Sequence, residues 1–272
     1  MIVNSKEILI NAKKNNVAIP HFNINNLEWT KYILEECNKN NSPVILGVSE
    51  SAIKYMGGTK TVVNIIKSLD LELDIKIPVV IHLDHGSTFE ICKEAIDNGF
   101  TSVMIDASKY DLEKNIEITK QVVQYALKYN VTVEAELGSI KSNSYVDLEE
   151  AKGFVEETKI DSLAPALGTV HGIYRDKPNI NIELCKKLSE EINVPLVLHG
   201  GSGIDDITLK KLVNAGINKV NINTELQLAW ANKVREYLIN NKDIYDPRKI
   251  ISSGEEAIKK VIKDKINILC SK

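Results

Sequence analysis

The stretch PVVIHLDHG, residues 78–86, decides how this sequence is read. It begins as an unbroken apolar run, which is typical of a strand buried on both faces. It ends with His82, Asp84 and His85 within four residues. A strand in a hydrophobic core has no use for two imidazoles and a carboxylate, whereas a metal site needs such ligands. We therefore interpret the stretch as a core strand with a metal site at its carboxyl end.

Short apolar runs of this kind recur along the chain, each followed by a longer amphipathic stretch. The candidate strands are residues 17–22, 44–48, 78–83, 102–106, 132–137, 162–167, 195–199 and 219–223. Asn98-Gly99 and Ala215-Gly216 are plausible helix ends, because glycine tolerates the left-handed conformation there. Eight β/α units without a break in composition predict an α/β fold of one domain over residues 1–272. We expect a (β/α)8 TIM barrel with extra C-terminal helices; a doubly wound open sheet is the alternative.

Composition excludes several classes of protein. The 272 residues carry a net charge of −3 and no basic block, which argues against a nucleic-acid partner. No apolar run approaches the roughly 20 residues that span a bilayer, and the N-terminus lacks a signal-peptide pattern, so no membrane partner is expected. The four cysteines are widely spaced, without a C-x-x-C motif, which predicts reduced thiols in a cytoplasmic protein.

Polar residues gather where the predicted strands end, which is where a TIM barrel carries its functional groups. They are His82, Asp84 and His85 in the third unit, Asp106 in the fourth, Glu134 and Glu136 in the fifth, His171 in the sixth, His199 in the seventh, and Asn221, Asn223 and Thr224 in the eighth. Three imidazoles with an open fourth position are the ligands of a catalytic zinc site, and the candidates are His85, His171 and His199. We interpret His21 and His82 as structural. The alternative for the three candidates is a set of unrelated polar loop residues.

Two turns at the same end of the predicted barrel suit an anion. HGGSG (199–203) and NINTE (221–225) follow the seventh and eighth strands, the usual phosphate site of such barrels. A metal and a phosphate would then share the barrel mouth. A metal can polarise a carbonyl group, and Asp84 can move a proton. This combination fits carbon–carbon bond chemistry on a phosphorylated ketose, and it also fits a metal-dependent phosphoester hydrolase.

At these residues the sequence resembles the class II, metal-dependent fructose-bisphosphate aldolases over nearly its whole length. The motifs that carry the resemblance are IHLDHGSTFE (81–90), SVMIDAS (102–108), VEAELG (133–138), LAPALGTVHG (163–172), PLVLHGGSGI (195–204), NINTE (221–225) and YDPRK (245–249). Tagatose-bisphosphate aldolases are close relatives. Gly86 and Gly201 favour a resemblance to the fructose-bisphosphate aldolases over the tagatose-bisphosphate aldolases.

The resemblance implies a role for each matching residue. Asp84 would be the acid and base at the C4 oxygen of the substrate. His85, His171 and His199 would hold the catalytic Zn²⁺, with Glu136 as an alternative ligand and Asp106 beside them. Residues that would contact the substrate are Asn23, Ser49, Gly172, Arg175, Gly200, Gly201, Ser202, Asn221, Asn223 and Thr224. Backbone oxygens of Val170, Gly172 and Gly200 would bind a monovalent cation, Na⁺ or K⁺. Arg248 would hold the far phosphate in a neighbouring subunit's site, which implies a homodimer or larger homo-oligomer.

The implied reaction is the reversible cleavage of fructose 1,6-bisphosphate to dihydroxyacetone phosphate and glyceraldehyde 3-phosphate, in glycolysis and gluconeogenesis. It would run through a zinc-stabilised enediolate, and we expect no lysine inside the strand ends to form a Schiff base. The sequence departs from the family pattern after VEAELG, where the family carries a longer acidic loop. Here Gly138 is followed directly by SIKSNSYVDLEE. Either the protein lacks this loop or the sequence omits it. Tagatose 1,6-bisphosphate or another ketose bisphosphate as substrate, and an inactive sugar-phosphate-binding barrel, remain alternatives.

Overall fold

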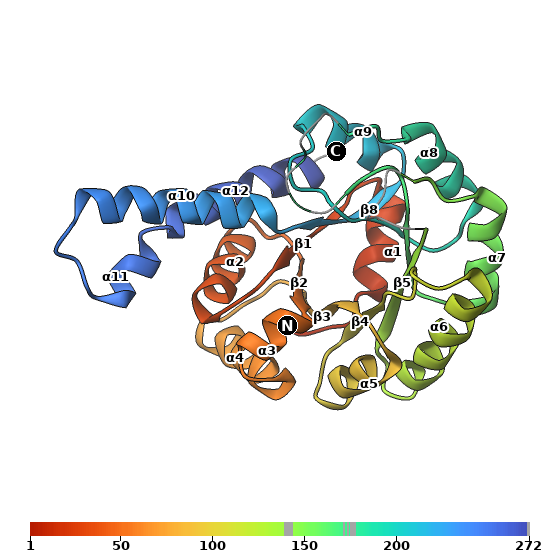
Figure 1. The fold of residues 1–272 in the computed structure, drawn as a ribbon, viewed down its shortest axis with the longest axis horizontal. Helices are drawn as coiled ribbons and strands as arrows, with labels where there is room; N and C mark the ends of the chain where they lie inside the picture. The colour runs from red at the N-terminus through yellow and green to blue at the C-terminus, as the bar shows by residue number, and fades with distance from the viewer. Residues whose placement is uncertain (139–143, 171, 173, 175–177, 271–272) are drawn as a thin grey trace.

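The computed structural model describes residues 1–272 except 139–143, 171, 173, 175–177 and 271–272. Eight parallel strands form a closed barrel in chain order, and β1 pairs with β8 (Figure 1). The strands are β1 (Ile19–Asn23), β2 (Val44–Ser49), β3 (Val79–Gly86), β4 (Ser102–Ile105), β5 (Thr132–Leu137), β6 (Ser162–Pro165), β7 (Leu196–Leu198) and β8 (Ile217–Ile222). The predicted TIM barrel is confirmed, and the open-sheet alternative is wrong because the first and last strands are hydrogen-bonded to each other.

An outer layer of helices covers the barrel (Figure 1). It consists of α2 (Leu27–Lys39), α3 (Glu50–Tyr55), α4 (Thr59–Glu72), α5 (Phe89–Asp97), α6 (Leu112–Leu127), α7 (Leu148–Thr158), α8 (Ile182–Glu191) and α9 (Asp206–Asn214). The predicted helix ends at Asn98-Gly99 and Ala215-Gly216 are confirmed, since both glycines have positive φ. Apolar residues of these helices pack on the outward faces of the strands and form the main hydrophobic core.

The end of the barrel opposite the predicted site is filled by α1 (Lys6–Asn15). Its Leu9 and Ala12 pack against Ile19, Ile45 and Val80, which lie near the starts of β1, β2 and β3. These five buried residues form a small second core, separate from the main one. Solvent and ligands therefore enter the barrel from the carboxyl ends of the strands.

The C-terminal helices are α10 (Thr224–Asn240), α11 (Pro247–Ser252) and α12 (Glu255–Leu269). Figure 1 shows α10 and α11 extending away from the barrel as an arm, and α12 returning along α10. Asp246 caps α11 and Pro247 occupies its first turn, so the predicted DPRK turn is the start of this helix. Within the described residues, no helix has the length and apolar character needed to cross a membrane.

Candidate active site at the barrel mouth

The end of β3 has an irregular backbone that shapes the site. His85 has φ of 55°, and the pairing of β3 with β4 shifts register between Leu83 and Gly86. In a regular strand, neighbouring residues point to opposite faces. The irregularity instead turns the side chains of both Asp84 and His85 into the same cavity. A left-handed conformation at a non-glycine residue is strained, and such strain is concentrated at functional sites.

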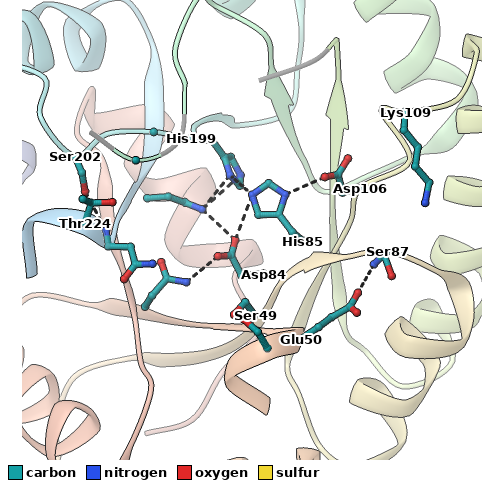
Figure 2. A pocket seen from close by; sticks show the side chains of 16 residues that line it. Ser49, Glu50, Asp84, His85, Ser87, Asp106, Lys109, His199, Ser202 and Thr224 are labelled. Atoms are coloured by element: carbon teal, nitrogen blue, oxygen red, sulfur yellow. Dashed lines mark hydrogen bonds and ion pairs between the residues drawn. The ribbon is translucent and has the colours of Figure 1, made fainter. Parts of the chain in front are cut away.

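The cavity at the mouth of the barrel has a volume of about 650 Å³, the size of a small-molecule site (Figure 2). The expected residues that line it are Asn23, Ser49, Asp84, His85, Asp106, Gly172, His199, Gly200, Ser202, Asn221, Asn223 and Thr224. Sequence analysis missed four other lining residues, which are Glu50, Ser51, Ser87 and Lys109. Glu50 and Ser87 follow β2 and β3 directly, so their positions after strand ends were the signal that could have identified them. The structure therefore gathers the predicted polar residues of six strands in one cavity.

His85 and His199 form the centre of the metal-ligand cluster. Nδ1 of His85 lies 3.1 Å from a carboxylate oxygen of Asp106, and Nε2 of His199 lies 2.9 Å from Oε1 of Glu134. Ionised carboxylates only accept hydrogen bonds, so each ring donates its N–H to its carboxylate. The remaining nitrogens, Nε2 of His85 and Nδ1 of His199, face each other at 3.0 Å. A proton can lie between these two nitrogens at this distance, and once that proton is lost their two lone pairs form a donor set that suits a divalent metal.

The charges around His85 also favour a cation. Burial lowers the pKa of His85, but the hydrogen bond to Asp106 and the charges of Asp84 and Glu136 outweigh it and raise the pKa to about 9. Glu136 Oε2 lies 3.7 Å from Nδ1 of His85. The candidate ligand atoms of His85, Asp106 and Glu136 lie within 4.8 Å of one another, and so do those of Asp84, His85 and His199. The residues present therefore fit a divalent ion such as Zn²⁺.

Asp84 is held between two amides. Asn23 Nδ2 donates to Oδ2 of Asp84 at 2.8 Å, and Asn221 Nδ2 donates to Oδ1 at 3.3 Å. Burial raises the pKa of Asp84, but positive charge on His21, on the cluster histidines and on Lys219 holds it well below its usual range. His21 is neutral above its own pKa of about 3, so near neutral pH it contributes little. Asp84 is therefore an ionised, oriented carboxylate that can accept a proton.

The start of α10 forms the side of the cavity that best suits an anion. Ser202 Oγ accepts hydrogen bonds from the backbone N–H groups of Asn223 and Glu225 at 3.1 and 3.3 Å. Its hydroxyl proton can then be donated to a ligand. Thr224 is the first residue of α10 and lines the cavity, so the positive end of the helix dipole faces this side. The start of α9 is capped by the carboxylate of Asp205, which makes α10 the better of the two predicted helix ends for an anion.

The remaining expected residues occupy different positions. His171 and Arg175 lie outside the described residues. A Cβ on Gly201 would lie 2.6 Å from Val220 Cγ1, so this glycine is needed for packing beneath the turn. A Cβ on Gly200 would lie 2.4 Å from the carbonyl oxygen of Val170, so these two backbone segments are close neighbours. That proximity is compatible with a shared monovalent-cation site.

Arg248 lies far from the cavity of its own chain. It belongs to α11 on the projecting arm (Figure 1), and 89% of its side chain is exposed. Its guanidinium makes two hydrogen bonds to the carboxylate of Asp246, at 3.1 and 2.9 Å. It can therefore act in a site only on another molecule.

The expectation that no lysine lies inside the strand ends is wrong, although the lysine found there does not line the cavity. A lysine does lie inside the barrel: Lys219 on β8 is 1% exposed, and its ammonium lies 2.6 Å from Oε2 of Glu134 and 3.2 Å from Nε2 of His82. His82 has the hydrogen bond expected of a structural histidine, since its Nδ1 lies 2.8 Å from Ser102 Oγ. Lys219 was missed because it precedes the strand end, although its place two residues before Asn221 puts both on one face of the strand.

The barrel and its cavity define a class of protein, namely a TIM barrel with a candidate divalent-metal site beside a candidate anion site at the carboxyl ends of its strands. The family model for class-II fructose-bisphosphate aldolase matches residues 3–272. Because the match covers nearly the whole chain, the protein belongs to the class-II fructose-bisphosphate aldolase family, whose members are zinc-dependent lyases.

Individual relatives agree with this assignment. The chain is 50% identical over 274 residues to a fructose-bisphosphate aldolase of Staphylococcus epidermidis, with 97% of this chain and 96% of the relative covered. It is 49% identical over 270 residues to the fructose-bisphosphate aldolase of Geobacillus stearothermophilus, covering 96% and 94%. Among solved structures, the YdjI aldolase from Escherichia coli K12 superposes with a TM-score of 0.89 at 33% identity, covering 99% of this chain and 97% of that one.

Proposed function

We propose that the protein catalyses the reversible aldol cleavage of fructose 1,6-bisphosphate to dihydroxyacetone phosphate and glyceraldehyde 3-phosphate, with a bound Zn²⁺. The observation that carries the proposal is the arrangement of three groups at one cavity. The facing nitrogens of His85 and His199 suit a metal, Asp84 is an ionised carboxylate beside them, and the start of α10 suits a phosphate. Relatives about half identical over nearly full length are named fructose-bisphosphate aldolases.

In this proposal the chain's own residues bind, orient and deprotonate the substrate. Ser202, Asn223 and Thr224 hold the phosphate of the dihydroxyacetone half. Asp84 accepts the proton of the C4 hydroxyl as the C3–C4 bond breaks. C3 of the dihydroxyacetone half then takes up one proton from solvent and Asp84 releases one, and the reverse reaction retraces these transfers. Asn23 keeps the carboxylate of Asp84 aimed at that hydroxyl. A bound divalent ion would polarise the ketone carbonyl and stabilise the negative charge that develops on its oxygen.

Schiff-base chemistry is disfavoured by the position of Lys219. A Schiff base needs an amine that reaches the substrate carbonyl. The ammonium of Lys219 is buried below the cavity and paired with Glu134 at 2.6 Å. Among the described residues that line the cavity, Lys109 is the one lysine or arginine. It is exposed, and its ammonium lies 5.0 Å from the ring centroid of Tyr110. The metal is therefore the proposed electron sink.

The proposal extends to the surroundings of the site. His171 completes the zinc ligands, Arg175 contributes to the substrate site, and Glu136 serves as an alternative ligand. Val170, Gly172 and Gly200 bind Na⁺ or K⁺ through backbone oxygens. The protein acts as a homodimer or larger homo-oligomer in which Arg248 serves a neighbouring site. A cytoplasmic location is supported by the four cysteines, which are all free thiols.

The test is an assay of the purified protein before chelation, after chelation and after zinc is restored. Cleavage of fructose 1,6-bisphosphate that disappears with the chelator and returns with zinc supports the proposal. Preference for tagatose 1,6-bisphosphate would change the substrate but keep the reaction. Release of inorganic phosphate from the bisphosphate, without cleavage, would indicate the hydrolase alternative. Absence of all three activities in protein that binds zinc and inorganic phosphate would indicate a binding role.

A further inference from the structure

A chain of polar contacts runs from the barrel interior to the metal-ligand cluster. Lys219 is in contact with His82 Nε2 and with Glu134 Oε2, and Glu134 Oε1 is in contact with His199 Nε2. The three links measure 3.2, 2.6 and 2.9 Å. All four residues are at most 2% exposed. The chain therefore connects a buried ammonium on β8 to one of the two imidazoles that face each other across the candidate metal site.

The direction of each hydrogen bond follows from Lys219, because an ammonium has three donors and no acceptor. Lys219 donates to Glu134 Oε2, and it also donates to Nε2 of His82. Glu134, as a carboxylate, accepts on both oxygens, so Nε2 of His199 must carry the proton. Nδ1 of His199 is then a lone pair directed at Nε2 of His85, as a metal ligand requires.

Stability alone does not explain a buried ion pair of this kind. Moving two charges out of water costs more than their attraction usually returns, and well-packed apolar residues would stabilise the barrel at least as well. Glu134 and Lys219 lie inside the barrel, below the cavity, and none of the proposed substrate contacts involves them. The useful consequence of the pair is the fixed orientation of Glu134 toward His199.

We propose that Lys219 is a positioning residue: its buried ammonium holds Glu134 so that His199 donates from Nε2 and presents Nδ1 to the metal. This inference rests on the metal site of the proposed function. It assigns no catalytic role to Lys219, which does not reach the substrate. Its effect is on the affinity of the protein for zinc, measured directly and separately from cleavage.

The Glu134→Gln variant is the decisive experiment, because an amide has one acceptor and one donor end. Lys219 can only donate, so it takes the amide oxygen and leaves the NH₂ group facing Nε2 of His199. Nε2 must then accept, and the ring proton moves to Nδ1, where it blocks the metal. Zinc affinity, measured by competition with a chromophoric chelator, should fall about 10- to 100-fold.

The double variant Lys219→Met/Glu134→Gln tests the part played by the lysine. Without the ammonium, the amide oxygen of Gln at position 134 can turn toward His199 and accept its Nε2–H. Adding Lys219→Met to Glu134→Gln should therefore restore most of the lost zinc affinity. The nitrogen-15 chemical shifts of His199 should report the proton on Nδ1 in Glu134→Gln and on Nε2 in the double variant. The Lys259→Met variant, which removes a lysine paired with Glu35 and Glu255 on the outside of the barrel, should bind zinc as the unaltered protein does.

The outcomes separate this inference from simpler explanations. If the double variant binds zinc as weakly as Glu134→Gln or more weakly, Lys219 does not set the tautomer and the inference is wrong. Zinc affinity unchanged in Glu134→Gln would also overturn it. Variants that lose only thermal stability, with zinc affinity intact in the folded protein, would show that the pair is merely structural. If the unaltered protein binds zinc but cleaves no sugar bisphosphate, the proposed function fails while the positioning role is still tested by these affinities.

Discussion

Nε2 of His85 lies 3.0 Å from Nδ1 of His199, while the other nitrogen of each ring faces a carboxylate. This pairing links β3 to β7 across the barrel mouth. Two imidazoles whose outer N–H groups are both held by carboxylates present their remaining nitrogens to a common point. The carboxylates behind the rings would therefore contribute to the position of a bound metal as much as the rings themselves.

Replacing Asp106 with alanine should weaken zinc binding through its effect on His85. Asp106 accepts the Nδ1–H of His85, and loss of such a partner typically costs about 10- to 100-fold in metal affinity. Chelator competition on the purified variant measures this loss. The Asp97→Ala variant, which removes an exposed carboxylate on α5 paired with Lys93, is the control. Equal zinc affinity in both variants would contradict a role for Asp106 in orienting His85.

Replacing Asp84 with asparagine should lower kcat and leave zinc content unchanged. The amide has nearly the shape of the carboxylate but cannot accept the C4 hydroxyl proton, so we expect kcat to fall on the order of 10²- to 10⁴-fold. Steady-state assays with fructose 1,6-bisphosphate, together with metal analysis, make the comparison. The exposed residue Asp74 provides a matched control as Asp74→Asn. A variant that loses its zinc as well would assign Asp84 to metal binding instead.

The metal-free protein should be most stable at about pH 6.5. The pKa of His85 is raised to about 9, so its stabilising contribution is complete below the unfolded value near 6.5 and is lost as pH rises through about 9. The pKa values of Asp84 and Asp106 are lowered, so their contributions are present above about 4 and are lost at lower pH. The pKa of His21 is lowered to about 3 by burial and that of His82 is lowered as well, so below about pH 6.5 both imidazoles take up protons in the unfolded chain and stability falls. Urea unfolding in the presence of chelator should therefore show a maximum at about pH 6.5.

The His85→Asn variant serves as the control for this pH profile. Without the imidazole, the fall in unfolding free energy between roughly pH 6.5 and 9 should become much smaller. A metal-free protein whose stability rises with pH over this interval would mean that His85 is not held by Asp106 and the neighbouring carboxylates in solution.

Lys109 should contribute to binding of the second phosphate. It is the one lysine or arginine among the described residues that line the cavity, and it follows β4, across the barrel from the start of α10. Lys109→Met should raise KM for fructose 1,6-bisphosphate about fivefold, as expected for loss of a solvent-exposed ion pair. KM for fructose 1-phosphate, which lacks the second phosphate, should stay the same. Equal changes for both substrates would rule out this contact.

The fold was readable from the sequence because short, mostly apolar runs recur along the chain, with polar residues at or just after the ends of most of them. Alternation within strands also placed Glu134 and Glu136 on one face, and both contact cluster histidines. The kink at His85 was not predictable, because a left-handed backbone at a non-glycine residue depends on tertiary packing. The position of Lys219 two residues from Asn221 indicated that both side chains lie on one face of the strand. It was missed because a charged residue is rarely expected inside a core.

The remaining prediction concerns Arg248, which is exposed on α11 and can serve only a site on another molecule. If it holds the far phosphate in a partner's site, the Arg248→Ala and Asp84→Asn variants should complement each other in a mixed dimer. One site of such a dimer carries both substitutions. The other site has an intact Asp84 from one subunit and an intact Arg248 from its partner, and it should work normally.

Random reassociation of equal amounts of the two variants makes about half of the dimers mixed, so activity should recover to roughly one quarter of the unaltered level. Each variant, dissociated and reassociated alone, is the control and should stay at its own low activity. Recovery requires both that the protein is an oligomer and that Arg248 acts between subunits. A mixture no more active than the average of the two variants, in a protein shown by sedimentation to be dimeric, would place Arg248 outside the active site.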